Sequence, residues 1–512
     1  MPQKQNPGVA DIIAGISVAA VVVPQSLAYA ELAGLPAYTG LYAAALPSLA
    51  AAFFASSRHL QTGPVAMTAL LTFGALSTFA EPFTPEYIGL ALLLALIVGV
   101  VRVGLGLLRG GALTHFMSNP VVLGFTTGAT LLIIASQSAV IFGVTDAPDD
   151  LLERLWFVVI HPDQWSLGAI GLSAVTIALV MGSRRIHPLF PGVLVAVLIG
   201  LALGQIDGAF ELVGDVPSGL PPISLDLPWA ETPMLILSGA IIAVVGFAEP
   251  TAIARTFAAQ DRVRWNPDRE LVSQGVANLA SGLSGGFPVG GSFSRSAINR
   301  LSGAKTRWSG AVTGLAVLAF TPFAGVVSGL PRAVLGAIVV AGVVRLVKLR
   351  SLWRLFEISW GQGIIAVATF VATLVLSPRI DLAVLFGMGL AAAVHISREA
   401  SRLSVATEID GDVLTMEPTG VLFYASAQAF ARSFNEAIAD HPDITRLVID
   451  LEGVGRLDLG GTMELKTLVW DAEEAGLTVE LTNIPRHAQG VITRAERFIE
   501  EEGGGRPNPM GT

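Results

Sequence analysis

The sequence predicts an α-helical membrane protein with fourteen transmembrane segments in two inverted repeats of seven, followed by a small cytoplasmic α/β domain. Apolar residues make up 52% of the 512 residues and charged residues only 14%, whereas a soluble domain carries about 25% charged residues. This deficit lies in a series of apolar runs that ends near residue 397. Two of these runs are short, and they occupy matching places in the two halves of the series.

The apolar runs define the candidate membrane spans, because a helix needs about 20 apolar residues to cross the hydrocarbon core. Most runs are rich in Ala, Val, Leu and Ile with small residues interspersed, as close packing of membrane helices requires. The fourteen segments lie near residues 9–30, 38–54, 64–79, 87–108, 119–143, 166–181, 188–204, 232–254, 270–284, 293–300, 308–328, 331–347, 360–377 and 380–397.

The basic residues of the loops predict the orientation. The odd-numbered loops hold only Arg154, Arg332 and Arg379. The N-terminus and the even-numbered loops hold seventeen cations: Lys4, Arg58, Arg102, Arg109, Arg184, Arg185, Arg255, Arg262, Arg264, Arg269, Arg300, Lys305, Arg307, Arg345, Lys348, Arg350 and Arg354. The positive-inside rule therefore places the N-terminus in the cytoplasm, and an even number of spans places the C-terminal domain there too.

The two short segments point to a binding site. Residues 64–79 begin after Gly63-Pro64, and residues 293–300 follow the glycine-rich run 285–291. Each segment is third in its set of seven. Interrupted segments at matching positions of two halves are typical of inverted-repeat transporters with a site near the bilayer midplane. The alternative is two glycine-rich loops beside ordinary helices.

Several other function classes lack support in the sequence. There are no cysteines, the seven histidines are scattered, and no basic, aromatic-interleaved patch for nucleic acid appears. GAKT at 303–306 lacks the spacing of a phosphate-binding loop. The N-terminus lacks the features of a signal peptide, so the first apolar segment reads as a retained span. We therefore predict no enzyme activity, no cofactor and no metal site.

Three motifs resemble those of the SulP family, which includes sulfate permeases, bicarbonate and dicarboxylate transporters, and prestin. They are VPQSLAYAELAGLPAYTGLY at 23–42, SSRHLQTGPVAM at 56–67, and ELVSQGVANLASGLSGGFPVGGSFSRSAINRLSGAKT at 270–306. The resemblance covers essentially the whole chain. It implies a core domain and a gate domain, alternating access by an elevator movement of the core, and a homodimer in the cytoplasmic membrane.

The resemblance also implies that the cargo lies where the N-termini of the third and tenth segments face each other. Helix N-termini carry unpaired N–H groups and about half a positive charge, so two of them suit a small anion. Arg295 lies at the start of the tenth segment, and an arginine at membrane depth is a functional candidate. Its alternative role is structural, with bonds to backbone carbonyls or to a neighbouring acid. The neighbouring Ser294 can donate a hydroxyl or simply cap the helix.

The first and third spans supply the other predicted binding residues. Pro24 bends the first span and can direct Gln25 inward. Tyr29, one turn further on, matches an aromatic wall residue of the family. Val65 and Ala66 would contribute backbone N–H groups and a tight wall. For Gln25 and Tyr29 the alternative role is helix packing.

Two acids in the membrane pattern are the predicted proton-coupling residues. Glu31 lies near the extracellular end of the first span, and Glu249 lies beside Pro250 in the eighth. A buried carboxylate is costly when charged, so it can carry a proton. Glu31 could instead be an interfacial acid, and Glu249 the partner of an arginine such as Arg295. Sodium is the competing coupling ion, since some family members place sodium near the eighth span.

The sequence predicts a transmembrane domain over residues 1–403, a second domain over 404–502, and a flexible tail over 503–512. In the second domain, 446–452 and 477–483 read as strands and 461–476 as a helix. This domain resembles the STAS domain. Leu459 follows Asp458 where related antagonists carry a phosphorylatable serine, so we expect a folding, docking or dimer-supporting module and no phospho-switch.

The predicted function is secondary active transport of a small anion, with proton symport as the coupling. Sulfate, bicarbonate, chloride and dicarboxylates all suit two helix N-termini and one arginine. Sodium symport, anion exchange and a channel of the same fold remain alternatives, as does an anion sensor that does not transport.

Overall fold

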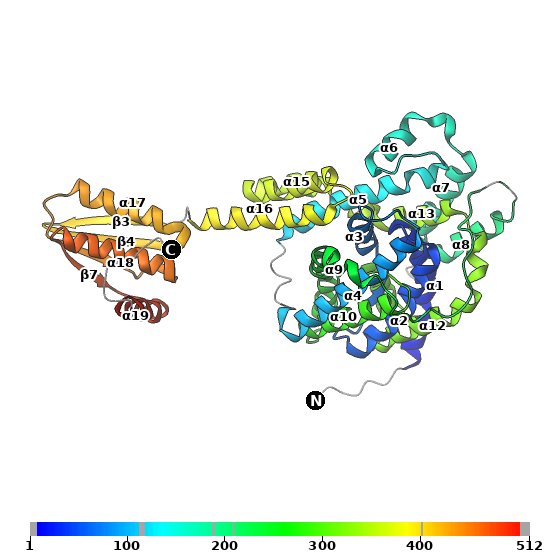
Figure 1. Cartoon of the computed structure of the whole chain (residues 1–512), viewed down its shortest axis with the longest axis horizontal. Coiled ribbons are helices and arrows are strands. Elements are labelled where there is room, and N and C mark those ends of the chain that lie inside the picture. Colours follow the sequence, from blue (N-terminus) through cyan, green and yellow to red (C-terminus); the bar gives the residue numbers. More distant parts are fainter. Residues whose placement is uncertain are drawn as a thin grey trace. The chain divides into compact units, whose positions relative to one another are not determined.

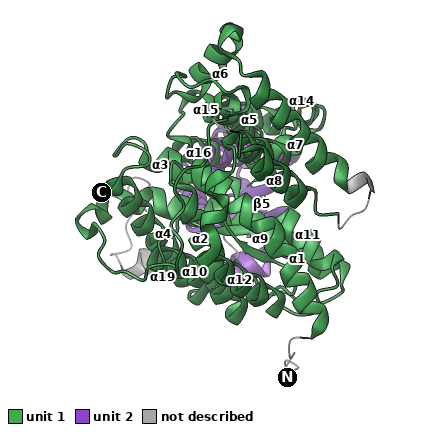
Figure 2. Cartoon of the chain, turned by 90° about the vertical axis from the view of Figure 1, so that its right-hand side faces the viewer, with its two compact units in different colours: residues 1–388 green, residues 389–512 purple. Residues whose placement is uncertain are grey.

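The computed structural model describes residues 8–111, 118–186, 190–206, 208, 210–400 and 403–501. The chain forms two compact units, residues 1–388 and 389–512 (Figure 2). The tail predicted over 503–512 lies outside the described residues.

All fourteen predicted segments contain helices, most of which Figure 1 labels. The first set comprises α1 (Val9–Leu32), α2 (Ala37–Phe54), α3 (Ala66–Leu76), α4 (Pro85–Leu107), α5 (Asn119–Phe142), α7 (Leu167–Ile186) and α8 (Gly192–Leu203). The second set comprises α9 (Thr232–Gln260), α10 (Pro267–Leu283), α11 (Phe293–Leu301), α12 (Trp308–Phe320), α13 (Arg332–Val343), α15 (Trp360–Val375) and α16 (Ile380–Ala400). Two further helices, α6 (Leu151–Ile160) and α14 (Leu349–Ile358), were not predicted.

The helices differ in length and polarity according to their place in the fold. Among the described residues, seven helices are long and apolar enough to cross a membrane by length and composition, and four shorter apolar helices accompany them. The helix α10 is polar, but it packs against α4 and α2 and buries Glu270, Gln274 and Asn278 completely. These polar side chains therefore face the protein interior, away from lipid.

The helix pairings have the symmetry of an inverted repeat. If each span is replaced by the span seven places away, α4 becomes α12 and α10 becomes α2. The packing of α4 on α10 is accordingly matched by the packing of α12 on α2. In the same way, α1 on α12 is matched by α9 on α4, and α5 on α15 by α13 on α7. The fold class predicted from the sequence is thus confirmed.

These pairings divide the helices into two bundles. The core bundle consists of α1 to α4 and α9 to α12, and the gate bundle of α5 to α8 and α13 to α16. The bundles meet mainly where α1 contacts α13, α8 and α5, and where α3 contacts α5. Within the core bundle, α1 and α2 touch backbone to backbone, because a Cβ atom at Gly40 would lie 1.9 Å from the Ser26 carbonyl oxygen. Small residues allow this approach.

The second unit contains a sheet with strand order β3-β4-β5-β7, in which β3 and β4 are antiparallel and β6 pairs with β4. Its elements are β3 (Ser404–Asp410), β4 (Val413–Leu422), α17 (Tyr424–Asp440), β5 (Arg446–Asp450), β6 (Val454–Leu457), α18 (Leu459–Glu474), β7 (Thr478–Thr482) and α19 (Arg486–Glu501). The predicted strands and helix of this domain appear as β5, β7 and α18. Asp458 caps α18 by accepting a hydrogen bond from the Gly461 N–H at 2.8 Å, and Leu459 is exposed.

Candidate substrate-binding site

A short antiparallel ribbon brings together the N-termini of α3 and α11, the short helices that begin the two predicted half-spans. The strand β1 (Gln61–Gly63) pairs with β2 (Gly290–Ser292), with Gln61 opposite Ser292 and Gly63 opposite Gly290. β1 leads through Pro64 and Val65 into α3, and β2 leads directly into α11. Because the strands run in opposite directions, the two helices run away from each other and their N-termini meet at the ribbon.

Arg295 joins the two N-termini. It lies in the first turn of α11 and is 1% exposed. Its Nη1 donates to the Pro64 carbonyl oxygen at 2.7 Å, immediately before α3. Its Nε and Nη2 atoms are buried and have no hydrogen-bond partner among the described residues. Gly63 leaves room for the guanidinium, since a Cβ atom there would lie 3.4 Å from Nη2. Unused donors of a buried cation are suited to an anionic ligand.

The helix α1 supplies a second wall of the site. It packs against both α3 and α11. Gln25 and Tyr29 are both buried, lie one turn apart on α1, and therefore share a face of the helix. The Tyr29 hydroxyl lies near Arg295, and the Gln25 Oε1 atom has no partner among the described residues. Pro24 removes one backbone hydrogen bond of the helix just before Gln25.

The remaining predicted binding residues lie at the two helix starts. Val65 is the N-cap residue of α3 and provides no side-chain cap, so the first-turn N–H groups have no side-chain acceptor from that position. Ala66 follows it as the first helical residue. In α11 the cap is Ser292, whose Oγ accepts from the Arg295 N–H and lies 3.2 Å from Ser294 Oγ.

Glu249 reaches the same region from α9. Its carboxylate lies near the Phe293 N–H at the start of α11, and near Arg295 and Tyr29. A carboxylate of the protein itself therefore lies at one of the two helix N-termini. The sequence could not show this contact, because Glu249 and Phe293 belong to different spans.

Glu31 lies elsewhere. Its Oε1 atom is 3.4 Å from the Arg332 Nε atom at the start of α13, and Arg332 Nη1 is 2.5 Å from Glu211 Oε1. Glu31 and Arg332 also line a cavity of about 1110 Å³, whose other described walls come largely from α3, α5 and the loops beside them. Because α1 belongs to the core bundle and α13 to the gate bundle, this ion pair crosses between the bundles.

The location of Arg102 was predicted wrongly from the sequence. Arg102 was counted among the cytoplasmic loop cations, but it lies inside α4 and is 0% exposed. It donates to the carbonyl oxygens of Ala243, Val289 and Ile242 at 3.0, 2.9 and 3.2 Å. Arg255, counted in the same way, lies inside α9. The signal for its burial was present, since Arg102 lies within the predicted span 87–108.

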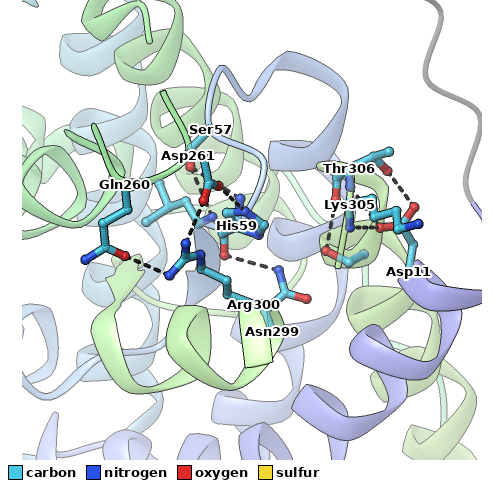
Figure 3. Close-up of polar contacts among 11 residues, drawn as sticks. Asp11, Ser57, His59, Gln260, Asp261, Asn299, Arg300, Lys305 and Thr306 are labelled. Atoms are coloured by element: carbon cyan, nitrogen blue, oxygen red, sulfur yellow. Dashed lines mark hydrogen bonds and ion pairs between the residues drawn. The ribbon is translucent and has the colours of Figure 1, made fainter. Parts of the chain in front are cut away.

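A polar network holds the end of α11 against the approach to β1 (Figure 3). His59 Nε2 and Arg300 Nη2 each lie 2.7 Å from a carboxylate oxygen of Asp261, which follows α9. Arg300 Nη1 donates to Gln260, and the Asn299 side chain donates to the His59 carbonyl oxygen. Burial alone would raise the pKa of Asp261, but the hydrogen bonds from Arg300 and His59 hold this pKa below its usual value.

A second cluster in Figure 3 ties the start of α1 to the segment before α12. Asp11 Oδ1 accepts from the N–H groups of Lys305 and Thr306 at 2.8 and 2.9 Å, and Oδ2 accepts from the Thr306 hydroxyl. Both clusters lie within the core bundle. They join α11 to α9 and the approach to β1, and α1 to the segment before α12.

Among the described residues, no group of three His, Asp or Glu side chains lies close enough to hold a metal ion.

Two family matches together account for most of the chain. The Sulfate permease family matches residues 9–369, and the STAS domain matches residues 404–498. The chain belongs to the sulfate permease family. Proteins of this family are transporters of anions and not enzymes, so the chain is a multi-pass integral membrane anion transporter. The resemblance inferred from the three motifs is confirmed.

The sequence similarity to two relatives, one from a plant and one from a bacterium, extends over most of the chain. The chain is 31% identical to probable sulfate transporter 4.2 of Arabidopsis thaliana, over 95% of this chain and 77% of that one. It is 34% identical to a probable sulfate transporter of Mycobacterium tuberculosis, over 75% of this chain and 69% of the relative.

Solved structures share the fold at lower identity. The overall structure of SLC26A9 superposes with a TM-score of 0.86 and 20% identity, covering 96% of this sulfate permease and 87% of that chain. The transmembrane domain of the cyanobacterial bicarbonate transporter BicA gives a TM-score of 0.64 and 22% identity, covering 75% and 97%. At these identities the likeness concerns the fold alone.

Proposed function

We propose that this anion transporter is a secondary active carrier that imports a small anion together with a proton, as the core bundle moves against the gate bundle. The observation that carries the proposal is the meeting of two half-helix N-termini around a buried arginine with unused donors. Sulfate, bicarbonate or a dicarboxylate would accept from Arg295 and from backbone N–H groups of α3 and α11.

The position of Glu249 supports the proton as the coupling ion. When ionised, its carboxylate places a negative charge near the α11 N-terminus and Arg295, so it competes with an anionic cargo for the same positive potential. Protonation of Glu249 removes that competition. Proton binding and anion binding at this site therefore favour each other, which is the thermodynamic requirement for symport. A cotransported proton also offsets an electrical cost of about 2.3 kcal/mol per charge per 100 mV.

We further propose a homodimer in the cytoplasmic membrane with both termini in the cytoplasm. The excess of Lys and Arg in the even-numbered loops supports this orientation, even without Arg102 and Arg255. The homodimer rests on the family resemblance.

The first test is the cargo. Purified protein in liposomes is expected to take up one of labelled sulfate, bicarbonate or a dicarboxylate with saturable kinetics and counterflow. The physical reason is that a carrier must present one binding site alternately to the two sides. Flux that rises linearly with anion concentration and shows no counterflow would indicate a channel. Anion binding without any flux would indicate a sensor.

The second test is the coupling residue. Glu249→Gln keeps the size of the side chain but removes its ionisation, so uptake should lose its dependence on an imposed pH gradient. Glu31→Gln is the matched control, because Glu31 lies outside the Arg295 site, and it should retain that dependence. If only Glu31→Gln removes the dependence, the proton is carried by Glu31. If wild-type uptake ignores a pH gradient and follows a sodium gradient, sodium symport replaces the proposal, and if it follows neither, exchange does.

A further inference from the structure

The unpredicted helix α14 has the character of an interfacial helix. Its sequence is LRSLWRLFEI. Leu352 is 98% buried and therefore marks the face of α14 that packs against the protein. Leu349, Trp353 and Ile358 are exposed, as is Trp360 just beyond the helix. The aromatic rings of Trp353, Phe356 and Trp360 follow one another at centroid distances of 5.9 and 5.3 Å. Such an exposed apolar and aromatic stripe is typical of helices that lie at the membrane–water boundary.

Four cations surround this stripe. Arg345, Lys348, Arg350 and Arg354 are all exposed, and α14 contains a single acid, Glu357. No hydrogen bond or ion pair joins any of the four cationic side chains to another residue that the structure describes. Elsewhere in the same unit, the half-buried Arg300 pairs with Asp261. These four positive charges are therefore available to a binding partner outside the chain.

The repeat provides an internal comparison. The helix α6 occupies the corresponding place in the first repeat, between the fifth and sixth spans, and it also exposes an apolar stripe with Trp156 and Val159. Its surroundings have the opposite charge, because Asp149, Asp150 and Glu153 accompany one arginine. That arginine, Arg154, donates to the Pro148 carbonyl oxygen at 2.8 Å. Inversion of the repeat places α6 and α14 at opposite faces of the membrane.

We propose that α14 is a docking surface for the headgroups of anionic phospholipids and that it anchors the gate bundle in one leaflet. The cations would pair with headgroup phosphates, while Leu349, Trp353 and Trp360 enter the acyl boundary. α14 packs against α15 and α5, which both belong to the gate bundle. Lipid binding would therefore hold the gate bundle in place. This surface is separate from the Arg295 site, so the proposal does not depend on the cargo.

The test measures lipid binding by the purified full-length protein. Phosphatidylglycerol and phosphatidylcholine are added to the protein in detergent, and bound lipid is counted by native mass spectrometry. The double variant Arg350→Gln with Arg354→Gln should bind phosphatidylglycerol about ten-fold more weakly, because two cations near the headgroups are lost. The matched control is Arg262→Gln with Arg264→Gln, which removes two exposed cations from the loop between α9 and α10. This control should bind like the wild type.

Three results would overturn the proposal. One is equal phosphatidylglycerol binding by the α14 variant and the wild type. Another is an equal loss in the α14 variant and its control, which would reflect general surface charge. The third is displacement of the lipid by inorganic phosphate alone at equal concentration, which would assign the cations to a soluble anion. An unchanged melting temperature in phosphatidylcholine shows that the variant is folded, and Trp353→Ala provides a second variant that should weaken binding without changing charge.

Discussion

Replacing Arg295 with alanine is expected to reduce apparent anion affinity or turnover by roughly ten- to a hundred-fold, the effect of losing charged hydrogen bonds of about 1.5–3 kcal/mol. The guanidinium supplies the unused Nε and Nη2 donors at the point where α3 and α11 meet. Uptake of labelled anion into proteoliposomes, as a function of anion concentration, measures the loss. Arg295→Lys keeps the charge but loses the fork of donors, so it should fall between alanine and the wild type.

Arg102 provides the matched control for this experiment. It is also an arginine buried inside the core bundle, but its guanidinium donates to three backbone carbonyl oxygens. Arg102→Ala should therefore lower the melting temperature while leaving the apparent anion affinity of the folded fraction unchanged. If Arg295→Ala shows the same pattern, with lower stability and unchanged affinity, Arg295 is structural and the proposed site is wrong.

Cross-linking position 31 to position 332 is expected to stop transport almost completely. The Glu31–Arg332 ion pair joins the core bundle to the gate bundle, so it must break if one bundle moves against the other. The native chain has no cysteine, which makes Glu31→Cys with Arg332→Cys a clean target for a bifunctional thiol reagent. Uptake by the same double variant before cross-linking, and after release by a reductant, provides the baseline.

The control pair is Glu211→Cys with Arg332→Cys. The Glu211 carbonyl oxygen accepts from the Arg332 N–H at 2.9 Å, and Leu212 forms a β-bridge with Pro331, so these positions belong to the same side of the interface. Cross-linking them should leave transport close to the level of the untreated variant. Full transport by the cross-linked 31–332 pair would show that the two bundles do not separate at this point.

The spans were predictable from sequence because a membrane helix must be apolar over a known length. The half-helices were predictable from Gly63-Pro64 and the glycine-rich run before α11. The helices α6 and α14 were not predicted, because each has only ten residues and carries charges, so neither forms a long apolar run. Arg102 was misplaced because a cation after an apolar run is usually at a span end, and only the facing carbonyls of α9 and of the segment before β2 make its burial tolerable.

The candidate site was predictable only in part. Gln25, Tyr29 and Arg295 followed from family motifs, and the structure brings α1 and α11 together as expected. The two acids were less accessible to sequence reasoning. Glu249 contacts the start of a different span, and Glu31 pairs with Arg332, which lies in the other repeat. No local pattern links residues so far apart along the chain, so these partners required the fold.

The antiparallel ribbon between the half-helices also has an electrical consequence. Since α3 and α11 run away from a common point, their peptide dipoles oppose each other along the membrane normal and largely cancel, although both keep their positive ends at the ribbon. The transmembrane voltage therefore exerts little net force on this helix pair. It acts on the formal charges of Arg295, Glu249 and the bound anion. Transport should accordingly become more or less sensitive to voltage as those charges change, and Glu249→Gln alters that sensitivity while leaving the helices in place.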